Sequence, residues 1–275
     1  MNTTNLNELL KSSSLAEIQS DVIATLKAKP ADTNARELLF KLYCLAGSWQ
    51  KALLQIETLT KFAPDMTKQA ELYKNLVLSE TLREEVLAGK RDPGTLGNPL
   101  PEWAILMQQA NQHLHEGDYS QSEELREQAL SQAPESAGEN SSATPFSWIA
   151  DSDSRIGPVC EFISAGGYRW VPFADVQLMT ISKPKNITDL VWAPAQLTVN
   201  NKVWYSYIPA RYPLSLNADN DTKLGLKTEW SQPADSLYIG SGRKMFITDQ
   251  NEYALFDIEE FRFDVEKFGF DEQAN

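Results

Sequence analysis

Residues 33–65, TNARELLFKLYCLAGSWQKALLQIETLTKFAPD, have the apolar pattern of two helices joined by a tight turn. Apolar side chains recur every three or four residues on both sides of Gly47, the spacing that places them on one helix face. They are Leu38, Leu39, Leu42 and Tyr43 before the turn, and Ala52, Leu53, Ile56 and Leu59 after it. The stretch therefore predicts a helix-turn-helix unit.

The same plan recurs in residues 101–136. When the two passages are aligned on Pro64 and Pro134, Gly47 superposes on Gly117. Further helices are predicted over residues 15–26 and 68–87. Such helix pairs cannot bury their apolar faces alone, and stacked pairs leave a concave surface suited to a peptide or a helix.

The first passage resembles the tetratricopeptide repeat, whose characteristic Tyr, small Ala and closing Pro are matched by Tyr43, Ala52 and Pro64. The second passage departs from that motif, because His113 and Ser122 stand where the Tyr and the Ala are expected. We therefore predict degenerate, TPR-like helix pairs forming an α-α superhelix over residues 1–138.

The chain changes character near residue 140, since 20 of its 27 aromatic residues follow Asn140. Short β-branched and aromatic runs separated by turn residues predict strands. We expect hairpin turns at 166–167, 200–201 and 240–242, with residues 135–145 as a linker and 91–101 as a connecting loop. The fold class is then α+β, with residues 139–275 forming a β-rich, small SH3-like or half-closed barrel domain.

Composition restricts the partners. The net charge of −13 disfavours nucleic acid and anionic membranes, because both demand clustered Lys and Arg. The polar start of the chain lacks signal-peptide order, and its apolar runs are too short to span a bilayer, so we expect a cytoplasmic protein. Cys44 and Cys160 lie far apart in the sequence, and we interpret both as buried small side chains.

Asp151, Asp153 and Arg155 form the one segment that resembles a catalytic motif. An Asp-x-Asp after an apolar strand is typical of phosphotransferases with an aspartate nucleophile, but that fold needs a parallel sheet, which the predicted hairpins oppose. A calcium loop is disfavoured because Ile156 and Phe162 replace its glycine and glutamate. We expect the two carboxylates to accept turn N–H groups and to pair with Arg155. A small hydrolase or phosphotransferase centred on this turn is the alternative.

No other segment suggests catalysis. His113 and His115 project from different helix faces, so they cannot chelate one metal together. Ser241 lacks the nucleophile elbow of a hydrolase. We therefore predict a non-enzyme with no catalytic residue, cofactor or metal.

Several ordered motifs in the second half resemble the ImpE (SciE, TagJ) family. They are FSWIADSDSRIGPVCEFISAGGYRWVPF at 146–173, DLVWAPAQLT at 189–198, IPARYP at 208–213, TEW at 228–230 and GSGRKMFITDQNEYALFDI at 240–258. The resemblance implies an accessory role in bacterial type VI secretion. It further implies binding to a helical segment of the small subunit of the contractile sheath, beside the Clp-type ATPase that disassembles the sheath.

The predicted function is thus a protein-binding adaptor, with a self-associating structural subunit as a further alternative. We predict protein contacts at Glu37 and Lys41 on the first helix pair, and at Trp192, Arg211 and Tyr212 in the second half. Aromatic and arginine side chains anchor interfaces disproportionately, although aromatic residues in a small barrel often belong to its core.

Overall fold

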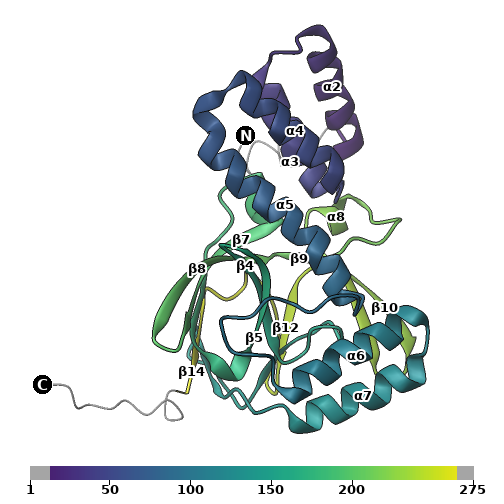
Figure 1. Cartoon of the computed structure of the whole chain (residues 1–275), viewed down its shortest axis with the longest axis vertical. Coiled ribbons are helices and arrows are strands. Elements are labelled where there is room, and N and C mark those ends of the chain that lie inside the picture. Colours follow the sequence, from purple (N-terminus) through teal and green to yellow (C-terminus); the bar gives the residue numbers. More distant parts are fainter. Residues whose placement is uncertain (1–12, 265–275) are drawn as a thin grey trace, which may run out of the picture.

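The computed structural model describes residues 13–264, with helices first and strands after them (Figure 1). This order confirms a mixed α+β fold. The helices are α2 (Leu15–Ala28), α3 (Thr33–Leu45), α4 (Trp49–Phe62), α5 (Thr67–Leu87), α6 (Glu102–Glu116), α7 (Tyr119–Gln132) and the short α8 (Asn220–Lys223). Three 3-10 turns occur at η1 (Pro64–Met66), η2 (Phe173–Asp175) and η3 (Ile187–Leu190).

The helix boundaries follow from local capping chemistry. Ser14 and Glu17 form a capping box at the start of α2, and Asp32 accepts the Ala35 N–H at the start of α3. Helix α6 ends at Gly117, whose φ of 83° is a left-handed conformation that glycine adopts without strain. The predicted helices and the two helix-turn-helix passages are therefore present.

The strands of residues 13–264 form one antiparallel sheet of eight strands and two sheets of three strands. The large sheet has the order β2-β1-β14-β6-β7-β8-β4-β5, and the small ones have the orders β10-β11-β9 and β13-β12-β3. Strands of the large sheet are β1 (Gly138–Asn140), β2 (Pro145–Phe146), β4 (Val159–Ser164), β5 (Gly167–Pro172), β6 (Val176–Ile181), β7 (Trp192–Val199), β8 (Lys202–Pro209) and β14 (Glu260–Phe263). Strands of the small sheets are β3 (Ile149–Asp151), β9 (Arg211–Tyr212), β10 (Thr228–Ala234), β11 (Leu237–Arg243), β12 (Met245–Thr248) and β13 (Glu252–Ala254).

Two of the predicted hairpin turns are confirmed. Asn200 and Asn201 have φ values of 50° and 58° and join β7 to β8, as a two-residue turn with positive φ requires. Gly166 and Gly167, with φ values of 98° and 115°, make the turn between β4 and β5.

Two other predictions are wrong. The stretch 135–145 is not a free linker, because β1 pairs with both β14 and β2. Residues 240–242 are not a hairpin turn but lie within β11, where the missing side chain of Gly240 makes room for the ring of Tyr212. A Cβ atom at Gly240 would lie 2.2 Å from Tyr212 Cδ2. The glycine is needed for close packing and not for a turn.

The core passes through the junction of the two halves. One apolar cluster includes Phe40, Leu76 and Trp103 from helices together with Trp170 and Trp192 from strands. A second cluster lies within the β half and is rich in Phe side chains, which pack mostly edge to face. Figure 1 shows α5 running from the upper helices down to the strands, with the α6–α7 pair beside them. Within residues 13–264, no helix has the length and apolar character that crossing a membrane requires.

Candidate functional site

The Asp151–Arg155 turn begins at the end of β3, and both of its carboxylates are buried. Asp151 Oδ1 accepts the N–H of Asp153 at 3.0 Å. Asp153 receives the backbone N–H of Arg155 at 2.9 Å and both ends of its guanidinium, at 2.9 and 2.6 Å. It also accepts the N–H of Gly240 at 2.9 Å. These contacts occupy the carboxylate of Asp153 and join the turn to β11.

A buried ionic cluster extends from this turn to helix α5. Arg83 donates two hydrogen bonds, of 2.7 and 2.6 Å, to the carboxylate of Glu161 on β4, and it also contacts Glu80 at 3.2 Å. Lys244 lies between Asp151 and Glu161, at 2.7 Å from the latter. All five side chains are at most 4% exposed. Sequence reasoning missed this cluster because Arg83 and Glu161 lie 78 residues apart.

Burial and the neighbouring cations separate the pKa values of two carboxyl groups in the cluster. Burial raises the pKa of Asp151 to about 6, against the opposing effect of the Lys244 ammonium. Burial acts the same way on Glu161, but the charges of Arg83 and Lys244 outweigh it and hold its pKa at about 2. Glu161 is therefore the permanently ionised centre of the cluster.

The three second-half residues predicted as protein contacts are buried inside the chain. Trp192, Arg211 and Tyr212 are 1%, 3% and 1% exposed. Trp192 donates its indole N–H to Glu80 at 2.8 Å, and the Tyr212 hydroxyl donates to Asp151 at 2.7 Å. The guanidinium of Arg211 donates to the carbonyl groups of Cys44, Leu45 and Lys223 at the ends of α3 and α8. Trp192 and Arg211 join the two halves, whereas the hydrogen bonds of Tyr212 stay within the second half. Because all three side chains are buried, a partner could not contact them in the folded chain.

The other predicted site residues lie on helices. Glu37 and Lys41 form an i,i+4 pair at 2.6 Å on α3, and the Lys41 side chain is only 8% exposed. His113 lies 3.3 Å from Asp118, within the α6–α7 hairpin. Among residues 13–264, no three His, Cys, Asp or Glu side chains are grouped as a metal would require. Cys44 and Cys160 are both buried.

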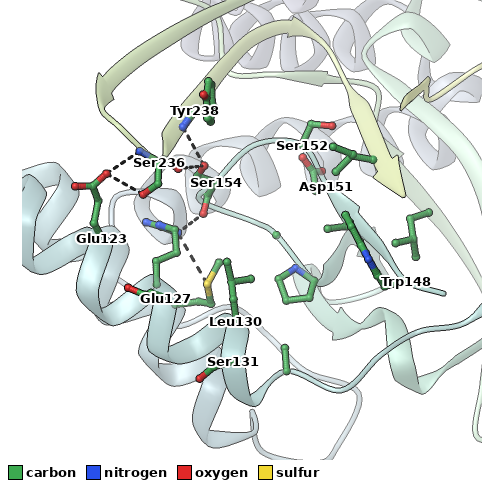
Figure 2. A pocket seen from close by; sticks show the side chains of 18 of the residues that line it. Glu123, Glu127, Leu130, Ser131, Trp148, Asp151, Ser152, Ser154, Ser236 and Tyr238 are labelled. Carbon is green, nitrogen blue, oxygen red and sulfur yellow. Dashed lines mark hydrogen bonds between the residues drawn. The ribbon is translucent and has the colours of Figure 1, made fainter. Parts of the chain in front are cut away.

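A groove with a volume of about 1380 Å³ lies between α7 and the β half. We call it the α7 groove. Figure 2 shows Glu123, Glu127, Leu130 and Ser131 on the helical wall, with Trp148 and Tyr238 contributed by the opposite side. These helical residues recur at the spacing of one helix face. Ser122 and Ala129, which do not line the groove, are buried, and the buried side chain of Arg126 lies at the base of the groove.

Large apolar side chains are exposed in this groove. Leu130, Trp148, Trp230 and Tyr238 line it and are 37% to 51% exposed. Deeper in the groove lie Met107 and Ile149, which are almost completely buried. Exposed aromatic and aliphatic side chains gathered in one concavity mark an interaction site. Sequence reasoning missed the groove because its walls come from separate segments, α7, residues 148–158 and residues 230–252, whose packing no local pattern indicates.

The α7 groove is held open by polar contacts at two places. At one end, Glu123 spans from α7 to the β10–β11 turn, where it accepts the N–H and the hydroxyl of Ser236 at 2.7 and 2.8 Å (Figure 2). At the base, Arg126 donates to the carbonyl of Ser154 and to Asn111 Oδ1 at 3.1 Å. The two walls are therefore fixed relative to each other.

These features define an α+β protein that joins helix pairs to antiparallel sheets through buried ion pairs and exposes an apolar groove. A family model described as ImpE protein matches residues 143–262. A Pseudomonas aeruginosa protein named type VI secretion system accessory component TagJ is 34% identical over 258 residues, covering 93% of this chain and 90% of that one. The chain therefore belongs to the ImpE/TagJ family, which confirms the family predicted from the sequence motifs.

A solved structure has the same fold. The crystal structure of protein VPA1032 from Vibrio parahaemolyticus matches with a TM-score of 0.85 at 24% sequence identity, covering 94% of this chain and 97% of that one. The arrangement of helices and sheets is therefore shared with an experimentally determined protein.

Proposed function

We propose that this protein is a non-catalytic cytoplasmic adaptor of a bacterial type VI secretion system. The name of its Pseudomonas aeruginosa relative, an accessory component of that system, supports the association. In this proposal a TPR-like helical unit, up to residue 138, and a small SH3-like or half-closed barrel β unit after it act together. They hold a helical segment of the small sheath subunit in the α7 groove, and the Clp-type ATPase is a second partner.

The observation that carries the proposal is the size and lining of the α7 groove. Its volume of about 1380 Å³ exceeds the roughly 300–1,000 Å³ typical of small-molecule sites. An exposed apolar floor beside a helix is the geometry in which proteins receive an amphipathic helix, with anchors at i, i+3, i+4 and i+7. A polypeptide segment therefore fits the groove better than a metabolite does.

The contacts of Asp151 and Asp153 weigh against the alternative of a hydrolase or phosphotransferase. Asp151 belongs to the wall of the groove, but its carboxylate is engaged by Lys244, Tyr212 and the Asp153 N–H. Asp153 is completely buried and paired with Arg155. Both oxygens of each carboxylate are engaged by groups of the chain itself, whereas nucleophilic catalysis requires an oxygen that is free to attack.

A titration tests the proposal. A fluorescently labelled peptide of the sheath subunit's helical segment should bind the full chain saturably, and Leu130→Asp should weaken it by roughly tenfold or more, the effect of losing one apolar anchor. Leu54→Asp is the matched control, because Leu54 is 60% exposed on α4, away from the groove. If the peptide does not bind the folded protein, the sheath subunit is not the partner. If both variants weaken binding equally, the α7 groove is not the binding site.

A further inference from the structure

The rim of the α7 groove carries acidic side chains on both sides. Glu124 and Glu127 extend from α7, and Asp235 and Glu252 lie across the groove on the β10–β11 turn and on β13. All four are exposed. Among the described residues that line the groove, Arg126 is the only Lys or Arg, and it is 4% exposed. The groove therefore presents an apolar floor between two negative edges.

Most of this negative charge is not neutralised within the protein. Glu123 is occupied by Ser236, but Glu124 and Glu127 make no side-chain hydrogen bond or ion pair with residues 13–264. By contrast, exposed acidic residues such as Glu71 and Asp219 are paired with Lys74 and Lys227. Like charges facing each other across a groove raise the affinity for cationic partners and repel anionic ones.

We propose that the α7 groove selects an amphipathic helix whose apolar face is flanked on both sides by Lys or Arg. This inference rests on the proposed function, and it defines the chemistry that a bound helix must have. The lining face of α7 runs from Ser120 to Ser131, which is about 16 Å or three helical turns. A helix of that length places one flank beside Glu124 and Glu127 and the other beside Asp235 and Glu252.

Three designed helical peptides test the inference on the full-length protein. They share one apolar face, and their flanking positions are all Lys, all Gln or all Glu. In fluorescence anisotropy titrations, the Lys-flanked peptide should bind at least about tenfold more tightly than the Glu-flanked one, with the difference falling as salt rises. Glu124→Lys/Glu127→Lys should reduce the Lys-flanked affinity by roughly tenfold, since two attractive pairs become repulsive. Glu57→Lys/Asp65→Lys, exposed residues of α4 and η1, makes the same charge change away from the groove and should leave the affinity unchanged.

Equal affinities for the three peptides, or an affinity unmoved by Glu124→Lys/Glu127→Lys, would overturn the inference. Its failure is distinguishable from failure of the proposed function. If the sheath peptide binds with unchanged affinity to Glu124→Lys/Glu127→Lys, the adaptor role stands and the charge selection falls. If the sheath peptide does not bind but the Lys-flanked peptide binds in the predicted order, the charge selection stands and the sheath partner falls.

Discussion

Removal of Arg83 should expose how strongly the buried ionic cluster determines stability. In Arg83→Met the side chain keeps its length but loses the charge that pairs with Glu161 and Glu80, so that Lys244 alone remains to balance both Glu161 and Asp151. Both carboxylates are at most 3% exposed, so water cannot replace the lost partner. Leaving a buried charge unpaired costs about 3–5 kcal/mol. At about 2–4 °C per kcal/mol for a chain of this size, the melting temperature should fall by roughly 6–20 °C.

A double variant separates this charge effect from a loss of packing. In Arg83→Met/Glu161→Leu the remaining charges balance. Lys244 still forms its ion pair with Asp151, and Glu80 still accepts the Trp192 indole N–H and lies near the positive charge of Arg211. Replacing a buried ion pair by apolar side chains is often nearly neutral, so the double variant should regain most of the lost stability. Thermal unfolding followed by tryptophan fluorescence measures all three proteins. A double variant less stable than Arg83→Met, or an Arg83→Met protein as stable as the parent, would refute the reasoning.

Three further predictions concern other parts of the fold. Gly240→Ala should lower stability by about 1–3 kcal/mol in urea unfolding, because its Cβ would overlap the buried Tyr212 ring; an unchanged midpoint would contradict the packing role of Gly240. The pKa of Asp151 is about 6 in the folded protein against 3.8 in the unfolded chain, so the folded state favours the protonated carboxyl group. The stability that this preference contributes is fully present below about pH 4 and is lost as the pH rises through 6. The free energy of unfolding of the parent should therefore decrease between pH 4 and 6, and Asp151→Asn should remove that decrease. If the two proteins show the same pH dependence of stability, Asp151 is not the group responsible. Cys44 and Cys160 have pKa values raised by burial, so a thiol reagent should label them only after denaturation, and rapid labelling of the folded protein would contradict their burial.

Local patterns predicted the elements of this fold well. The helix pairs follow from apolar spacing, and the Asn200–Asn201 turn follows from the few conformations that a two-residue hairpin allows. The glycine at 240 was misinterpreted because glycine serves both turns and close packing, and its packing partner, Tyr212, lies 28 residues earlier. The linker was misinterpreted because β1 gains its stability from β14 at the other end of the β half.

The site was harder to predict because it depends on contacts between distant segments. A signal for the ionic cluster was present: Glu161 interrupts the apolar run VCEFI, and Lys244 precedes MFIT. Charged residues in such positions are rarely buried unless they are paired, so Glu161 and Lys244 would each be expected to have a partner of opposite charge. The sequence could not identify that partner, since the pairing depends on how α5 packs against the β4–β5 hairpin. The same limit applies to the α7 groove, whose helical wall looked like an ordinary solvated face.

The ionic cluster and the α7 groove are mechanically connected. Arg83 fixes the last turns of α5 to β4, and the loop that follows pairs Gly94 with Arg169 at the edge of β5. This loop leads into α6, whose Asn111 donates to the Arg155 carbonyl in the Asp151–Arg155 turn. The α6–α7 pair is thus held from both ends against the strands that form the opposite wall. Because the walls of the groove are already ordered, forming a complex with a partner helix costs less conformational entropy. We therefore expect the buried Arg83–Glu161 pair to contribute to the affinity of the groove through the position of α7.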